Sequence, residues 1–486
     1  MSSRSRLRIL SVTHVLPDRD QATAAGCSPP PLPDDGLVRL SFMDALFVDR
    51  ALPMRRLFFY EGPGVPPFPR LARSLRASLA ATLAVFPPLS GKLTHRPSYG
   101  GGGEVVVDCS PAAVAPGVRF VEAEYDGGVG DMRRVAGGSD EGGNSEALMQ
   151  LGPELDATRL PAPVLAVQVT RPAVGGGVVV GVAVHHAVAD GHSVWQFMRA
   201  WTALSRLMEE GSQAMPDLLP PAFDRTPLLY PAAEELARKI LRTIAPSLPV
   251  IRSLSSSSPP DRRRRTFLIN ADEIQSVKQH ILTQQSKFKT TGEQSPDTHP
   301  IPTPSTYLAV SSLVWTSIAL AKSAGDLASG DAYFLVAVDY RRRLGGPAIT
   351  DRYFGDCVIP CVASAAARDL RDGGLARAAA AIRDAIRAQP EDPVRAMDAW
   401  LESLRTLPKE RFTFTGSSNR FMAYETDFGW GSPSRVELVS LFATELVLLL
   451  GAAGGGVQVT ATLCPEHMEA FAANLSRLSS GRGNDA

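Results

Sequence analysis

The sequence contains little cysteine, no excess of either charge and no long hydrophobic run. Its five cysteines are scattered and odd in number, which favours a reducing compartment over a framework of disulfides. The 50 basic and 50 acidic residues cancel, so the net charge favours neither nucleic acid nor an anionic membrane as a partner. No apolar segment could act as a signal peptide or span a bilayer. We therefore expect a soluble, cytoplasmic protein that recognises its ligands by local contacts.

The length of the chain predicts more than one domain. A chain of 486 residues is too long for one ordinary core, and two domains of roughly two hundred residues each are expected. The proline-rich tract within residues 212–231 has no regular period and is typical of a crossing between domains. We therefore expect an N-terminal domain at residues 1–211 and a C-terminal domain at residues 232–486.

Strand and helix patterns are mixed in both halves. The strand expected at residues 163–170 should pair with the strand expected at 178–184, because a short glycine turn joins them. The polar, glycine-rich segment at residues 127–144 lacks a period and is expected to be a loop. Near the end of the chain we expect a β-meander of three strands, at residues 436–442, 445–450 and 458–463. This mixture predicts an α/β fold with mixed sheets in both domains.

Residues 178–191 carry the clearest chemical signal. The β-branched and small residues of 178–184 predict a buried strand, and the apolar residues after the motif recur at helical spacing. His185, His186 and Asp190 therefore lie on a tight connection between a strand and a helix. Neighbouring side chains on a strand point to opposite faces, so one histidine is expected to be structural. We assign His186 as a general base, because Asp190 follows it by four positions and imidazole suits that role near neutral pH.

Two other interpretations of these histidines remain open at this stage. One is a pair of core histidines whose hydrogen bonds are satisfied. The other is a metal site with the ligands His185, His186, Asp190 and His192. Such a site would require two neighbouring residues of a strand to face the same ion. Cys357 and Cys361 lack a Cys-x-x-Cys spacing and a partner pair, so they do not support zinc. No metal site is predicted.

Three separated motifs resemble those of one enzyme family. They are His186-Ala187-Val188-Ala189-Asp190-Gly191, Tyr353-Phe354-Gly355-Asp356-Cys357 and Asp427-Phe428-Gly429-Trp430-Gly431. In their order and spacing the chain resembles the BAHD family of plant acyl-CoA-dependent acyltransferases. Other CoA acyltransferases and peptide-synthetase condensation domains use a similar HxxxDG motif, so the DFGWG motif is the more specific match.

The resemblance implies two similar, chloramphenicol-acetyltransferase-like α/β domains with mixed β-sheets flanked by helices, joined by a crossover loop, with an active-site channel between them. We expect a monomer that holds no bound cofactor and uses acyl-CoA as a co-substrate. His186 would assist direct attack of the acceptor on the thioester in a ternary complex. Asp190 would orient the motif loop, with Arg341 as its partner. The motif residues with a structural role close to the CoA would be Gly191, Asp427, Gly429, Trp430 and Gly431.

The motif at residues 353–357 resembles the branch that acylates glycosides of flavonoids, anthocyanins and simple phenols, commonly with malonyl-CoA. We therefore expect acyl transfer, with malonyl favoured, to a sugar hydroxyl of such a glycoside. The chain differs from this branch at Asp356, where asparagine is usual, and a carboxylate facing the channel would repel a malonyl carboxylate. The candidate cations for a malonyl carboxylate are Arg171, Arg420 and Arg435. The alternatives are a hydroxycinnamoyl transferase acting on a plant secondary metabolite and a catalytically silent binder of acyl-CoA or glycosides.

Overall fold

The computed structural model divides the chain into two compact units. The first unit comprises residues 1–257, 340–358 and 423–441, and the second comprises 258–339, 359–422 and 442–486. The structure describes residues 6–31, 35–49, 53–97, 103–137, 145–210, 220–251, 262–290, 303–322, 330–344, 349–372, 374–439 and 445–480.

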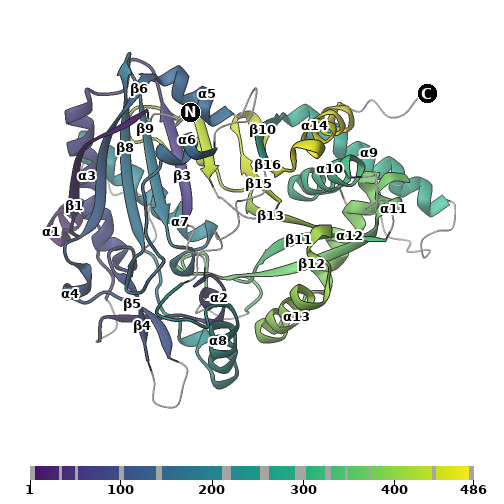
Figure 1. Cartoon of the computed structure of the whole chain (residues 1–486), viewed down its shortest axis with the longest axis horizontal. Helices are drawn as coiled ribbons and strands as arrows, with labels where there is room; N and C mark the ends of the chain where they lie inside the picture. Colours follow the sequence, from purple (N-terminus) through teal and green to yellow (C-terminus); the bar gives the residue numbers. More distant parts are fainter. Residues whose placement is uncertain are drawn as a thin grey trace. The chain divides into compact units, whose positions relative to one another are not determined.

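A mixed six-stranded sheet forms the centre of the first unit (Figure 1). Its strands, in spatial order, are β1 (Leu7–Val15), β6 (Val118–Gly128), β8 (Leu165–Val174), β9 (Val178–Val184), β3 (Met54–Tyr60) and β14 (Arg435–Val439). Strands β6 and β8 are parallel, whereas the other neighbours are antiparallel. The antiparallel pairing of β8 with β9 confirms the pairing expected from the sequence.

Helices cover both faces of this sheet. Phe59 of β3 belongs to a core cluster with Met132 of α5 (Val129–Gly137). The preceding residue, Phe58, points to the opposite face and meets Trp195 of α7 (Gly191–Glu210) edge-on, with ring centroids 5.9 Å apart. Helix α3 (Phe68–Val85) packs against α7. Strand β9 is buried along its whole length because both faces are covered, and this explains its continuous apolar sequence.

The rest of the first unit comprises a smaller sheet and further helices. Strands β2 (Leu37–Arg39), β5 (Glu104–Asp108), β4 (Lys92–Arg96) and β7 (Ala162–Pro163) form a four-stranded sheet in that order. The helices are α1 (Arg19–Ala24), α2 (Phe42–Ala45), α4 (Pro111–Val114), α6 (Ser145–Gln150) and α8 (Pro231–Ile244).

The second unit also contains a mixed six-stranded sheet. Its strands, in spatial order, are β10 (Arg263–Ile269), β16 (Val457–Leu463), β15 (Leu446–Gly451), β13 (Phe412–Ser418), β11 (Asp331–Asp339) and β12 (Val358–Ala366). Strands β11, β13 and β15 are parallel, whereas β15 and β10 are antiparallel to β16. The helices are α9 (Ala271–Thr290), α10 (Thr306–Ala321), α11 (Ala367–Asp372), α12 (Gly374–Ala388), α13 (Pro393–Thr406) and α14 (Pro465–Ser479). Helix α10 packs against α9, α12 and α14 (Figure 1). Both units thus have the expected α/β architecture.

Two expected segments are wrong in part. The first strand of the expected meander, β14, pairs with β3 in the first unit, whereas β15 and β16 pair with each other in the second. The expected loop at residues 127–144 begins with the end of β6 and helix α5, because Met132 and Ala136 of that helix are buried in the core. Residues 138–144 lie outside the described residues.

The two units are interleaved in sequence. They therefore differ from the consecutive domains expected at residues 1–211 and 232–486. The reason is that β14 and residues 340–358 join the first unit. Of the expected crossing at 212–231, residues 212–219 lie outside the described part, and Ala222 forms a β-bridge with Tyr353. Among the described residues, no helix is long and apolar enough to cross a membrane.

Candidate active site

The two consecutive histidines lie on a sharp turn where β9 ends. His185 keeps an extended backbone, and the 3-10 turn η2 (His186–Val188) begins directly after it. His185 is fully buried, and its Nδ1 accepts a hydrogen bond of 3.2 Å from the Ala187 amide. Burial lowers the pKa of His185 to about 4, which keeps this imidazole neutral at physiological pH. The change of backbone therefore gives the two histidines different surroundings.

His186 is oriented by contacts on its edge and on its face. Its Nδ1 lies 3.1 Å from Asp356 Oδ1, and its side chain is 21% exposed. The ring of Phe47, just after α2, stacks on the imidazole with centroids 3.7 Å apart and planes inclined by 10°. The imidazole is thus held in one orientation while part of the side chain remains accessible.

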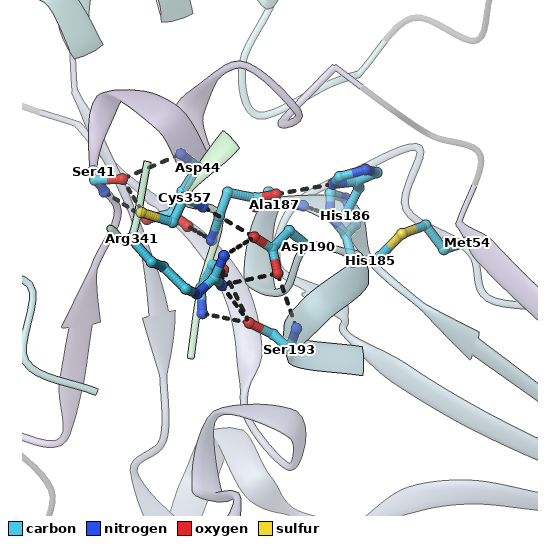
Figure 2. Close-up of polar contacts among 12 residues, drawn as sticks. Ser41, Asp44, Met54, His185, His186, Ala187, Asp190, Ser193, Arg341 and Cys357 are labelled. Atoms are coloured by element: carbon cyan, nitrogen blue, oxygen red, sulfur yellow. Dashed lines mark hydrogen bonds and ion pairs between the residues drawn. The ribbon is translucent and has the colours of Figure 1, made fainter. Parts of the chain in front are cut away.

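Asp190 forms a buried two-point ion pair with Arg341 (Figure 2). Arg341 Nη1 donates to Asp190 Oδ2 at 2.8 Å, and Nη2 donates to Oδ1 at 3.0 Å. The amides of Ser193 and Cys357 donate to the same carboxylate at 2.9 and 3.2 Å. Burial disfavours the charge of Asp190, but Arg341 and the Ser193 amide outweigh that effect and lower the pKa of Asp190. The structure thus brings Asp190 and Arg341 together.

The loop at residues 353–357 is fastened to the same motif. Arg341 Nη2 donates to the carbonyl oxygens of Tyr353 and Gly355 at 3.3 and 3.2 Å. Ser193 Oγ donates to the Gly355 carbonyl at 3.0 Å and accepts from the Gly355 amide at 3.1 Å. The two motifs are therefore parts of one packed structure within the first unit.

A second buried ion pair contacts this loop. Arg225 Nε donates to Asp44 Oδ2 at 3.0 Å, and the two side chains are 2% and 0% exposed. Asp44 also accepts hydrogen bonds from the amide and hydroxyl of Ser41, both at 2.8 Å, in the capping box of α2. Its Oδ1 accepts from the Asp356 amide at 2.8 Å. Burial disfavours the charge of Arg225, but Asp44 raises the pKa of Arg225 above its ordinary value.

Asp356 contributes a third buried carboxyl group to this cluster. Its Oδ1 faces His186, and its buried Oδ2 has no hydrogen-bond partner among the described residues. Burial raises the pKa of Asp356 well above its usual range, and the charges of Asp44 and Asp190 raise it further. The side chain is 0% exposed. Asp356 is therefore enclosed beside His186 and does not present an exposed carboxylate.

The DFGWG stretch forms a turn around its own aspartate. Asp427 Oδ1 accepts hydrogen bonds from three backbone amides, those of Gly429, Trp430 and Gly431, at 2.7, 2.9 and 2.9 Å. Gly429 and Gly431 adopt φ angles of +99° and +91°, which glycine tolerates without the steric cost of a Cβ. The conformation of this turn is thus specified by its own sequence.

The DFGWG turn packs against the far end of α7. Trp430 meets Tyr60 edge-on with centroids 5.3 Å apart, and the Arg206 guanidinium donates to the Asp427 carbonyl. Gly191 is the first residue of α7, and a helix that rises 1.5 Å per residue places Arg206 about 22 Å along the axis. The structure therefore does not bring this turn to His186.

Sequence reasoning missed three residues that shape the surroundings of His186: Asp44, Phe47 and Arg225. The spacing Ser41-x-x-Asp44 is a helix-start signal that could have identified α2 and its acidic cap. The pairing of Asp44 with Arg225 joins residues separated by 181 positions, and no local pattern marks it. Nor does any local pattern mark the stacking of Phe47 on His186.

Two of the three arginines considered for an acyl carboxylate already have acidic partners. Arg171 Nη2 lies 2.7 Å from Glu124 Oε2, and Arg435 Nε lies 2.6 Å from Oε1 of the buried Glu437. Arg420 is exposed and belongs to the second unit. The charges of Arg171 and Arg435 are therefore already neutralised within the first unit.

One group of metal-ligating types occurs among the described residues. Donor atoms of Glu445, Cys464 and His467 in the second unit lie within 4.8 Å of one another. Glu445 forms an ion pair with Lys322, and Arg262 Nη1 lies 3.9 Å from it. Since these two cations already neutralise the only carboxylate of the group, we assign no metal to it.

Comparison with known proteins gives consistent matches over almost the whole chain. A model of the Transferase family matches residues 29–478. Phenolic glucoside malonyltransferase 2 of Arabidopsis thaliana is 27% identical, over 86% of this chain and 88% of that protein. Shikimate O-hydroxycinnamoyltransferase of Nicotiana tabacum is 26% identical, over 85% of this chain and 90% of that protein. The crystal structure of vinorine synthase has the same fold, with a TM-score of 0.66 and 20% identity over 97% and 98% of the two chains.

Proposed function

Because this chain belongs to the Transferase family, the BAHD acyl-CoA-dependent acyltransferases, we propose that it transfers a malonyl group from malonyl-CoA to a sugar hydroxyl of a phenolic or flavonoid glycoside. The observation that carries the mechanism is the partly exposed His186, whose Nδ1 is turned to Asp356. A ring with its proton on Nδ1 has its lone pair on Nε2, the nitrogen from which a base acts.

In the proposed reaction, His186 Nε2 takes the proton from the acceptor hydroxyl. The acceptor oxygen forms a bond to the thioester carbonyl carbon as that proton leaves. The carbon–sulfur bond then breaks, and the proton passes from the imidazolium to the CoA sulfur. No acyl-enzyme forms, because donor and acceptor are bound together. General-base assistance of this kind contributes about a hundred- to ten-thousandfold to a rate, and orientation of the two substrates adds to it.

The other motif residues are proposed to act through structure. Asp190, with Arg341, holds the turn that carries His186, and Gly191 begins α7 behind it. The hydrogen-bonded turn at Asp427, Gly429, Trp430 and Gly431 is proposed to shape the CoA side of the site rather than to touch the reacting atoms.

The donor and acceptor are proposed from similarity. The Arabidopsis relative is a phenolic glucoside malonyltransferase, and a relative from Salvia splendens, 26% identical over 91% of this chain, is an anthocyanin 5-O-glucoside malonyltransferase. The hydroxycinnamoyltransferase of Nicotiana tabacum, at nearly the same identity, favours an aromatic donor as the second candidate. An aromatic donor is also consistent with the ion pairs of Arg171 and Arg435, because acidic partners already neutralise both arginines.

A donor panel tests this proposal. Purified protein is incubated with malonyl-, acetyl- or p-coumaroyl-CoA and a pool of flavonoid and phenyl glucosides, and the products are identified by mass spectrometry. A mass increase of one malonyl group, from malonyl-CoA only, is the expected result. Transfer from p-coumaroyl-CoA only would overturn the malonyl assignment in favour of the second candidate. Binding without transfer of any acyl group would instead indicate a catalytically silent relative.

A further inference from the structure

The buried cluster beside His186 contains one more carboxyl group than it has arginines. Two arginines, Arg225 and Arg341, each form an ion pair with one carboxylate, that of Asp44 and that of Asp190. Asp356 is buried in the same cluster and receives no hydrogen bond from either arginine among the described contacts. Its nearest partner able to carry a positive charge is the imidazole of His186, 3.1 Å away.

We propose that Asp356 is a positioning residue for His186: its Oδ1 accepts the Nδ1 proton, directs the Nε2 lone pair to the acceptor hydroxyl, and serves as the counter-ion when the imidazole takes the acceptor's proton. This inference rests on the proposed role of His186 as the base. The arrangement follows the same logic as the aspartate of a Ser-His-Asp triad, which fixes the histidine tautomer and stabilises the imidazolium.

The geometry supports each part of this role. The backbone amide of Asp356 is tied to Asp44 at 2.8 Å, so the loop cannot withdraw the carboxyl from the ring without breaking that bond. The ring of Phe47 stacks on the imidazole of His186 and restricts its rotation away from Asp356 Oδ1. The side chain of Asp356 is 0% exposed, so water does not screen its charge from His186.

Burial has a second consequence for this pair. Removal from water raises the pKa of Asp356, and the carboxylates of Asp44 on α2 and Asp190 before α7 raise it further. Protonation of His186 relieves the same excess of negative charge. The charged groups that act on Asp356 from the surrounding elements are Asp44, Asp190, Arg225 and Arg341. A positive charge on the imidazole favours the charged form of Asp356, and a charged Asp356 in turn favours the imidazolium, so the two groups titrate as a coupled pair.

The first test is Asp356→Asn, which keeps the shape and a carbonyl acceptor but removes the charge. Asp351→Asn is the matched control, because Asp351 lies near the same loop but is 61% exposed and pairs with the exposed Arg342. In Asp356→Asn we expect kcat to fall at least about tenfold and the acid limb of kcat/KM to move about one pH unit or more to lower pH. In the control, both should match the wild type. An unchanged kcat and acid limb in Asp356→Asn would overturn the proposal.

The second test needs no turnover and therefore separates this inference from the choice of substrate. Nitrogen-15 NMR of the imidazole of His186, assigned by its loss in His186→Ala, reports which ring nitrogen carries the proton. We expect protonated Nδ1 and unprotonated Nε2 at neutral pH, with a downfield Nδ1–H resonance that moves upfield in Asp356→Asn. If the proton resides on Nε2 in the wild type, the proposal is wrong even if malonyl transfer is found. If the expected NMR pattern appears but no acyl donor is used, the Asp356–His186 pair is supported and the proposed substrates are wrong.

Discussion

Arg341 and Asp190, separated by 151 positions in the chain, meet through two parallel hydrogen bonds of 2.8 and 3.0 Å. Both side chains are buried, at 0% and 1% exposure, and the same guanidinium holds the carbonyls of Tyr353 and Gly355. This one arginine therefore joins the histidine turn to the loop at residues 353–357. The shape of the site depends on a contact that neither motif can make alone.

Arg341→Ala should be strongly destabilising, because it leaves the Asp190 carboxylate buried without its counter-ion. Loss of one partner of a buried pair costs about 3–5 kcal/mol in the free energy of unfolding. Arg341→Lys should recover only part of this, since an ammonium cannot reproduce the two-point geometry. Urea unfolding followed by circular dichroism measures the effect.

Arg342→Ala provides the control for that prediction. The neighbouring Arg342 is 78% exposed and pairs with the exposed Asp351, so its removal should change the free energy of unfolding by less than about 0.5 kcal/mol. Equal losses in the two alanine variants would show that the buried pair has no special role.

The stability of the protein should decrease in acid partly through Asp190. Its folded-state pKa lies below that of an exposed aspartate, so the unfolded chain binds the proton more readily. The stabilisation is fully present above the unfolded pKa of about 4 and is lost as the pH falls through the lower, folded value. Asp190→Asn should have a lower free energy of unfolding at pH 7 and a weaker decline between pH 7 and acid. A decline as steep as that of the wild type would contradict this account.

Gly429→Ala should destabilise the DFGWG turn. Gly429 has a φ angle of +99°, where a Cβ is strained whatever space surrounds it. Such a conformation costs a residue other than glycine on the order of 1–3 kcal/mol. Gly176→Ala is the control, since Gly176 lies in a turn of the same unit with open space around the Cβ position and without a positive φ. Thermal melts of both variants test this, and similar melting temperatures would contradict the prediction.

The local part of this architecture could be predicted from the sequence. The uninterrupted apolar run at Val178–Val184 indicated a strand buried on both faces, and the change of period after it indicated helix α7. The expectation that His185 and His186 differ in their surroundings followed from strand alternation alone. These features depend on a few consecutive residues, and the structure contains all of them.

The non-local part could not be predicted in the same way. Strand β14 has the sequence of a meander strand, but it pairs with β3 across more than three hundred residues of chain. The glycines of residues 127–130 suggested a loop. The segment instead continues into helix α5, because Met132 and Ala136 of that helix are buried in the core. Asp356 was recognisable as an unusual residue, yet its direction toward His186 depends on a loop held by Asp44 and Arg341.

The most direct test of the central claim is the turnover of His186→Ala beside that of His192→Ala. The account predicts that His186→Ala loses about a hundred- to ten-thousandfold in kcat while isothermal titration shows CoA affinity close to that of the wild type. His192 directly follows the same motif, but its Nε2 contacts the Asp351 carbonyl, so His192→Ala should retain most activity. Turnover by His186→Ala at the wild-type rate, in a folded protein, would show that another group removes the acceptor's proton.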